Sequence, residues 1–344
     1  TSEAQPFAAS GGLADVSGSL PQALRRRLIG TRIVMPLYDE IPQNLKDEMR
    51  FITSLSVPVA WRRQYCGVFE ARWGGVIYYF LDNQYYFKRS GLYGHYDDAE
   101  RFAFFSRAVL EMLPFIDFKP DIIHCNDWQT ALVPTYYSLF YGQNQWYQGI
   151  KTIFTIHNIQ YQGKYGTELY EEVVGIPPHQ RSVLDWDGCI NFMKGAIETA
   201  NRVTTVSPSY AWEIRDPWFS HGLDPILNAR SWKLCGILNG IDTDSYNPET
   251  DIQIYNNFSV DDLSGKAENK RKLQERLSLE QNPDVPIIAM VTRLVSHKGL
   301  DLVKAALDQM MREEYIQFVI LGSGDWEYES FFQSMQDRYP GRLC

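Results

Sequence analysis

The sequence has few cysteines, no excess of basic residues and no long apolar run, and each absence excludes a class of protein. Its five cysteines contain no C-x-x-C pair, which argues against a zinc site or a disulfide framework and is typical of reduced thiols. Lys and Arg number 33 against 42 Asp and Glu, a net charge of −9, so we expect no nucleic-acid partner. No apolar stretch approaches the length of a membrane span, so we expect no membrane partner.

The sequence does have enough apolar residues for two globular domains. Of 344 residues, 44% are hydrophobic and 14% aromatic. Short apolar runs alternate with helical patterns, and this alternation predicts a doubly wound α/β sheet that is covered on both faces. We expect strands at 31–37, 75–81, 121–125, 151–158 and 202–207, and helices at 97–113, 128–140 and 191–200.

A second α/β pattern follows a polar, turn-rich stretch at 239–272, which is typical of a crossover between domains. We therefore expect a first domain over 1–239, and a crossover with the start of a second doubly wound domain over 240–344. Two strand–helix pairs form only part of such a sheet, so we expect the second domain to be incomplete in this chain. The pattern predicts strands at 286–291 and 315–322 and helices at 299–311 and 326–336.

A glycine pair, Gly11 and Gly12, lies just ahead of an apolar helical pattern that starts at Leu13. Glycines there let the backbone approach a ligand and aim free N–H groups at it, and a helix N-terminus favours negative charge. The fragment therefore predicts a phosphate-binding loop. A glycine-rich turn that holds nothing is an equally good interpretation of these residues alone.

Polar side chains follow three of the expected strands at their carboxyl ends, where open α/β sheets bind ligands. Mixed donors and acceptors beside an aromatic ring suit a hydroxyl-rich ligand. Two alternatives stay open: a lone histidine in a strand is more often structural, and Asp127 could cap the helix that begins at Trp128. The residues are His124, Asn126, Asp127, Trp128, His157, Asn158 and Ser207.

Two basic residues, Arg293 and Lys298, lie in a loop between a strand and a helix of the second domain. Arg offers a planar fork to phosphate oxygens, Lys a mobile charge, and the helix end adds a partial positive charge. A single such pair is usually two solvated cations. A glycine loop at 321–325, after the neighbouring strand, favours a diphosphate site instead.

Many segments of the chain, in order, resemble the starch synthases and bacterial glycogen synthases. They include GGLADVSGSLPQAL, YYFLDNQYYFKR, PDIIHCNDWQTALVP, TIHNIQYQGKYG, NFMKGAIETANRVTTVSPSYAWEI and TRLVSHKGLDLV. The resemblance implies a GT-B fold, in which two Rossmann-like domains face a cleft. It also implies transfer of glucose from ADP-glucose to the non-reducing end of an α-1,4-glucan with retention, without a cofactor or metal. The cell compartment would be a bacterial cytoplasm, or a plastid in a photosynthetic eukaryote.

The same resemblance implies roles for individual residues. Those implied to be catalytic are His157, Arg293 and Lys298. Those implied to bind the donor are Ser10, Gly11, Gly12, Asp15, Asn158, Asn239 and Gly322. Those implied to line the cleft and acceptor site are Tyr93, Asp127, Trp128 and Ser207.

The sequence departs from the family pattern in two places. The family loop reads Lys-Thr-Gly-Gly, whereas here Ala9 and Ser10 precede the glycines, so the lysine expected on the donor is missing. A glutamate motif of the family lies beyond Cys344, so we expect a chain that ends there to be inactive alone. The alternatives are a non-catalytic glucan-binding protein or an inactive fragment. A nicotinamide-dependent oxidoreductase lacks its G-x-G-x-x-G loop, and no carboxylate pair indicates a glycosidase.

Overall fold

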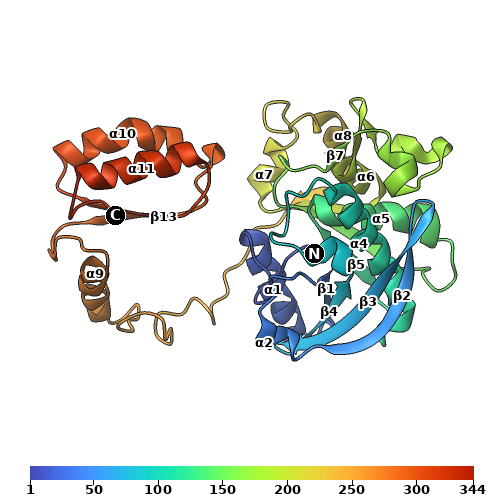
Figure 1. The fold of residues 1–344 in the computed structure, drawn as a ribbon, viewed down its shortest axis with the longest axis horizontal. Coiled ribbons are helices and arrows are strands. Elements are labelled where there is room, and N and C mark those ends of the chain that lie inside the picture. Colours follow the sequence, from blue (N-terminus) through green and yellow to red (C-terminus); the bar gives the residue numbers. More distant parts are fainter. The chain divides into compact units, whose positions relative to one another are not determined.

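The computed structural model describes residues 1–344, which divide into two compact units, Thr1–Gly240 and Ile241–Cys344 (Figure 1). The first unit holds two four-stranded sheets and a small three-stranded one, and the second holds a two-stranded sheet. The expected α/β architecture is confirmed. The division of the first unit into separate sheets was not predicted.

The first sheet has the strand order β1-β4-β3-β2 and is mixed. β1 and β4 are parallel, whereas β3 is antiparallel to both β4 and β2. β2 and β3 form the long curved hairpin of Figure 1. This hairpin was not predicted, because most residues of its strands are exposed or half-buried and form no long apolar run. The strands are β1 (Arg32–Pro36), β2 (Arg50–Val59), β3 (Arg62–Trp73) and β4 (Val76–Asp82).

The second sheet has the order β11-β10-β6-β5, and all of its strands are parallel. The strands expected at 121–125, 151–158 and 202–207 are three of its members. Since all four run the same way, their carboxyl ends share one edge. Its strands are β5 (Ile122–Asn126), β6 (Lys151–Ile156), β10 (Arg202–Thr205) and β11 (Leu234–Gly236). The small antiparallel sheet is formed by β7 (Lys164–Tyr165), β8 (Asp185–Trp186) and β9 (Cys189–Asn191).

The helices of the first unit largely match the expected ones, except at 128–140. There the chain forms three short pieces of different pitch. Pro134 lies inside this stretch and has no N–H to bond the preceding turn, which disfavours one regular helix. The longer helices are α1 (Gly12–Arg26), α4 (Asp98–Met112) and α6 (Phe192–Thr199), and the shorter α-helices are α2 (Gln43–Lys46), α3 (Gln84–Phe87), α5 (Leu132–Tyr136), α7 (Pro208–Glu213) and α8 (Asp224–Ala229). The remaining turns are η1 (Leu113–Phe115), η2 (Trp128–Thr130), η3 (Tyr137–Tyr141), η4 (Tyr170–Val174), η5 (Pro178–Val183) and η6 (Ser231–Lys233).

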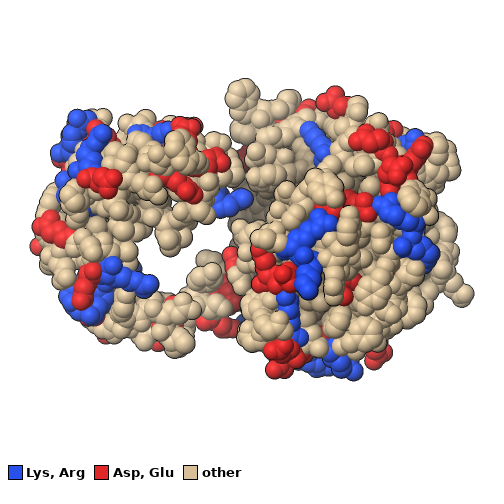
Figure 2. Space-filling model, in the orientation of Figure 1, with Lys and Arg blue, Asp and Glu red and all other residues tan.

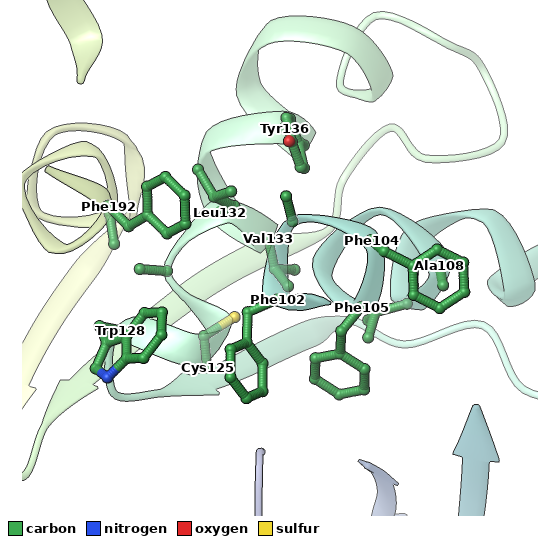
Figure 3. Packing of buried hydrophobic residues seen from close by; sticks show 14 of the residues in the cluster. Phe102, Phe104, Phe105, Ala108, Cys125, Trp128, Leu132, Val133, Tyr136 and Phe192 are labelled. Atoms are coloured by element: carbon green, nitrogen blue, oxygen red, sulfur yellow. The ribbon is translucent and has the colours of Figure 1, made fainter. Parts of the chain in front are cut away.

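The core of the first unit is aromatic and is centred on α4, which packs against β2 and α5. Phe102, Phe104 and Phe105 on this helix are fully buried. Figure 3 shows Phe102 beside Trp128, which in turn contacts Phe192 from another element. Full burial of each such ring contributes roughly 2–3 kcal/mol of transfer free energy. This packing joins α4 to the first sheet and to α5.

The second unit pairs two parallel strands, β12 (Ile287–Val291) and β13 (Gln317–Leu321). Its helices α10 (Leu300–Glu313) and α11 (Trp326–Arg338) lie on one face of this sheet (Figure 1). Leu307, Met311 and Phe318 form its small core. α9 (Ser264–Arg276) precedes the strands, and the turn η7 (Ser296–Lys298) precedes α10.

The surface carries charge of both signs. On the face in Figure 2, acidic and basic side chains are interspersed and form no large field of one sign. None of the helices is long and apolar enough to cross a membrane.

Candidate active site

Asp127 joins the carboxyl ends of β5 and β6. Its Oδ1 accepts hydrogen bonds from the backbone N–H groups of His157 at 2.8 Å and Asn158 at 3.4 Å. Its backbone has a φ of 57°, a left-handed conformation that is uncommon for residues other than glycine. The side chain does not cap the turn at Trp128, so that alternative was wrong. Asp127 instead fixes the start of the loop that follows β6.

Burial dominates the titration of Asp127. It raises the pKa to about 7, although the N–H groups of His157 and Asn158 act in the opposite direction and Glu3 adds a smaller rise. Near neutral pH this carboxyl group is therefore close to half protonated. A group of this kind can accept or donate a hydrogen bond toward a ligand hydroxyl.

His157 follows β6, and its imidazole faces β5. Nε2 lies 3.0 Å from Asn126 Oδ1, so the Nε2 proton is donated to the amide oxygen and Nδ1 is left as an acceptor. Burial, with a smaller effect of His124, lowers the pKa of His157 to about 4. The ring is therefore neutral at pH 7. It can bond a sugar hydroxyl but supplies no charge.

His124 lies within β5 and takes part in a chain of hydrogen bonds across three strands. Its Nε2 is 2.6 Å from Thr155 Oγ1 on β6, which is 2.6 Å from Thr204 Oγ1 on β10. Burial, with a smaller effect of the chain's N-terminal amino group, lowers the pKa of His124 to about 4. The hydrogen bond of His124 to Thr155 within the sheet favours a structural role, the alternative left open above, although the residue is partly exposed. These hydrogen bonds between His124, Thr155 and Thr204 had no signal in the sequence beyond the presence of β-branched residues in strands.

Ser207 and Trp128 are used by the fold in ways that the sequence did not reveal. Ser207 Oγ accepts a hydrogen bond from Tyr210 N at 2.9 Å and so caps α7. The Trp128 ring is buried and packs edge-to-face against Phe102, with ring centroids 5.1 Å apart (Figure 3). The expectation that this ring offers a face to a sugar does not hold, because core side chains surround it.

Tyr93 lies close to this cluster, in the loop that precedes α4. Its hydroxyl is 2.8 Å from Ser2 Oγ. Burial raises the pKa of Tyr93 well above its ordinary value, and the charges of Glu3 and Asp127 are among the smaller causes. The phenol is therefore neutral and lies within electrostatic reach of the strand ends.

The glycine loop begins α1 and leaves open space in front of it. A Cβ added at Gly11 or Gly12 would meet nothing within 4 Å. Gly11 is the N-cap, and its carbonyl accepts from Ala14 N at 3.1 Å, while no side chain caps the other N–H groups of the first turn. Ser10 N donates to Glu3 Oε2 at 2.5 Å, which ties the loop to the buried start of the chain. Asp15 is exposed in the first turn.

In the second unit Arg293 and Lys298 are exposed at the end of β12 and in η7. Neither forms an ion pair. Both act on His297 between them: after burial, the charges of Lys298 and Arg293 lower its pKa, partly offset by Asp325. Both cations therefore act on the same position of this loop, His297.

Gly322 is required by the packing of two loops. A Cβ there would lie 1.9 Å from the Thr292 carbonyl oxygen. The loops after β12 and β13 are joined by backbone hydrogen bonds, with Leu294 N donating to Ser323 O and Asp325 N donating to Leu294 O, both at 2.8 Å. The structure thus gives Gly322 a packing role, which sequence analysis did not predict.

Comparison with known proteins decides the family. Residues 1–229 match the model described as starch synthase catalytic domain. Glycogen synthases from Alkaliphilus metalliredigens and Geobacillus thermodenitrificans are 49% and 50% identical over 344 residues, covering 99% of this chain and 72% and 71% of those proteins. The catalytic domain of starch synthase IV from Arabidopsis thaliana, bound to ADP and acarbose, superposes with a TM-score of 0.90 at 34% identity, covering 99% of this chain and 72% of that one.

The chain belongs to the starch and glycogen synthase family. Its members are glycosyltransferases of the GT-B fold, and both units of this synthase chain have the corresponding α/β architecture. Among residues 1–344 no group of three or more His, Cys, Asp or Glu side chains is arranged to hold a metal ion.

The structure of this synthase gathers the candidate residues into two separate groups. Within the first unit, Asp127 joins the strand ends that carry His157 and Asn158, and Tyr93 lies near them. Asn239 is exposed at the end of that unit. The second group, in the second unit, consists of Arg293, Lys298 and Gly322. Sequence analysis missed Glu3, Asn126 as the partner of His157, and the ion pair of Asp98 with Arg101.

Proposed function

We propose that this protein transfers glucose from ADP-glucose to the non-reducing end of an α-1,4-glucan, with retention at the anomeric carbon. The observation that carries the proposal is the similarity, over 99% of this chain and 72% of the other, to a starch synthase whose structure is described as bound to ADP and acarbose. ADP is the group that leaves when ADP-glucose gives up its glucose. The polar side chains at the strand ends of the first unit supply the mixed hydrogen-bond donors and acceptors that a sugar needs.

The departing diphosphate gains negative charge as its bond to glucose breaks, and cations that face it lower the barrier. We assign this task to Arg293 and Lys298. Both are exposed and unpaired, so binding a diphosphate breaks no existing ion pair. Neither role requires a metal ion or another cofactor, and we propose that the reaction uses none.

The first unit would hold the sugar. The neutral His157 has Nδ1 free to accept a hydrogen bond from a glucose hydroxyl, while Asn126 fixes its ring. Asp127 holds the loop that carries His157 and Asn158. At the open N-terminus of α1, beside Gly11 and Gly12, backbone N–H groups would donate hydrogen bonds to the phosphate oxygens of ADP-glucose, because a helix N-terminus favours anions.

The test is incorporation of radiolabelled glucose into glycogen by the protein expressed from its complete reading frame. ADP-glucose and UDP-glucose are compared as donors. The Lys298→Ala variant, which lacks one of the two cations assigned to the diphosphate, is compared with the unsubstituted protein. We expect transfer from ADP-glucose, little from UDP-glucose, and a loss of about 100-fold or more in the variant, the scale of removing one preorganised charge.

The linkage of the product tests retention. The donor glucose is α-linked, so retention joins it to the glucan by an α-1,4 bond. β-Amylase cuts such chains from the non-reducing end and should release the label as maltose. Label that resists β-amylase would contradict retention. Glycogen that binds tightly without any incorporation would favour the alternative, a non-catalytic glucan-binding protein.

A further inference from the structure

The loop at 91–94, which carries Tyr93, is fixed on both sides of that residue by the same pair of side chains. On one side, the Leu92 carbonyl accepts a hydrogen bond from Arg101 Nη1 at 3.1 Å. On the other side, Gly94 N donates to Asp98 Oδ2 at 2.8 Å. Both partners belong to the first turns of α4. The helix therefore holds the two neighbours of Tyr93 directly.

Asp98 and Arg101 also bind each other in the interior of the first unit. Arg101 Nη1 lies 2.5 Å from Asp98 Oδ1, and the two side chains are 0% and 9% exposed. Arg101 Nε donates to the Tyr86 carbonyl at 2.8 Å, while its Nη2 is buried without a hydrogen-bond partner. Asp98 is therefore bifunctional, with one oxygen on the guanidinium and the other on the loop.

Stability does not explain why these charges are buried here. Desolvation of a buried ion pair often cancels its attraction, and apolar residues of similar volume are often as stable or more so. An ion pair does supply direction, because a guanidinium has donors in a fixed fork and a carboxylate has two separate acceptors. The geometry that this pair sets is the conformation of the loop at 91–94.

Tyr93 connects this loop to the site. Its hydroxyl bonds Ser2 Oγ at 2.8 Å, and its ring centroid is 6.0 Å from that of Phe102, the residue after Arg101. Phe102 packs in turn against Trp128, which follows Asp127. A shift of the loop would therefore move the phenol relative to the strand ends that carry the candidate site.

We propose that Asp98 and Arg101 are positioning residues that hold Tyr93 beside the strand ends of the candidate site and so set the affinity for the glucan. The inference rests on the proposed function for its consequence in catalysis. Its structural part, that the pair fixes the loop at 91–94, is independent of any activity.

Amide hydrogen exchange tests the structural part in the protein expressed from its complete reading frame. Asp98→Asn keeps the size of the side chain, but an NH2 donor replaces one carboxylate oxygen, so the amide cannot accept from Arg101 and Gly94 at their two separate positions. Loss of one hydrogen bond, about 1.4 kcal/mol, should speed exchange at Gly94 about tenfold. Glu100→Gln is the matched control. Glu100 lies on the same helix, but its Oε1 bonds Arg62 Nη2, at 2.5 Å, and the Tyr86 hydroxyl, and no residue of the loop. Unchanged exchange at Gly94 in Asp98→Asn would overturn the proposal.

Glucan kinetics test the catalytic part. We expect Asp98→Asn to raise the KM for glycogen about tenfold with a smaller change in kcat, since misplacement of a positioning group weakens binding geometry. In a Tyr93→Ala background the same substitution should add little, because both act through one group. Equal KM values in Asp98→Asn and Glu100→Gln, or additive effects with Tyr93→Ala, would contradict the proposal.

Arg101→Lys is the second variant in case Asp98→Asn does not fold. It keeps the charge but replaces the fork by a single nitrogen, which cannot bond Tyr86, Leu92 and Asp98 together as Nε and Nη1 do, so the KM for glycogen should rise in the same direction. A KM equal to that of the unsubstituted protein would overturn the assignment of Arg101. If the unsubstituted protein transfers no glucose at all, the proposed function fails, while the exchange measurement still decides whether the pair fixes the loop.

Discussion

The two glycine loops of this synthase should respond in opposite ways to the same substitution, Gly→Ala. At Gly322 a Cβ would lie 1.9 Å from the Thr292 carbonyl oxygen, well inside any real contact, so the two loops must separate. Overpacking of this kind destabilises by about 1–3 kcal/mol. At Gly12 the added methyl meets nothing within 4 Å, and the residue is the first in a helix. There Ala is as stable as Gly or better, by up to about 0.5–1 kcal/mol.

Urea unfolding and donor kinetics separate the two roles. We expect Gly322→Ala to lower the free energy of unfolding of the second unit by about 2 kcal/mol. We expect Gly12→Ala to leave stability unchanged or slightly raised, while the KM for ADP-glucose rises about tenfold, because the methyl group occupies the surface that a phosphate would approach. A stable Gly322→Ala variant would refute the packing argument. An unchanged donor KM in Gly12→Ala would refute the role of the opening loop.

Three further predictions concern single residues of the first unit. Ala9→Lys restores the cation of the family loop and should lower the KM for ADP-glucose, and an unchanged value would contradict donor contact at this loop. Folding raises the pKa of Asp127 from 3.8 to about 7, so its ionisation destabilises the fold progressively between about pH 4 and pH 7. In urea unfolding, the stability of Asp127→Asn relative to the unsubstituted protein should therefore rise by about 3 kcal/mol from pH 5 to pH 8. Thr155→Val removes the bridge between His124 and Thr204 and should destabilise by about 1–3 kcal/mol, with Thr155→Ser restoring most of it in the same assay.

The parallel strands were predictable because each is a short apolar run that ends in polar residues. β5, β6 and β10 lie where the sequence placed them, within a few residues. The β2–β3 hairpin was missed because its strands are largely exposed or half-buried and mix polar with apolar residues without a long apolar run. Neighbouring strands also pair across long stretches of sequence, and no local pattern reports such pairing.

The candidate residues were easier to find than their surroundings. Family motifs pointed to His157 and Asp127, but only the fold shows that Asp127 bonds the backbone of His157. Trp128 was predicted to offer its ring to a sugar but is buried. An aromatic residue after a strand can face either the core or solvent, and the sequence does not distinguish the two. Gly322 was predicted to lie in a ligand-binding loop because glycine permits close approach of another group. Sequence alone does not say whether that group is a phosphate or the Thr292 carbonyl.

Transfer of label from ADP-[14C]glucose to glycogen, by the protein expressed from its complete reading frame, tests the central claim most directly. The account predicts labelled α-1,4 chains from the unsubstituted protein, and a loss of about 100-fold or more in both His157→Ala and Lys298→Ala with folding retained. Equal transfer by the unsubstituted protein and both variants, or no transfer by a protein that still binds ADP, would contradict it.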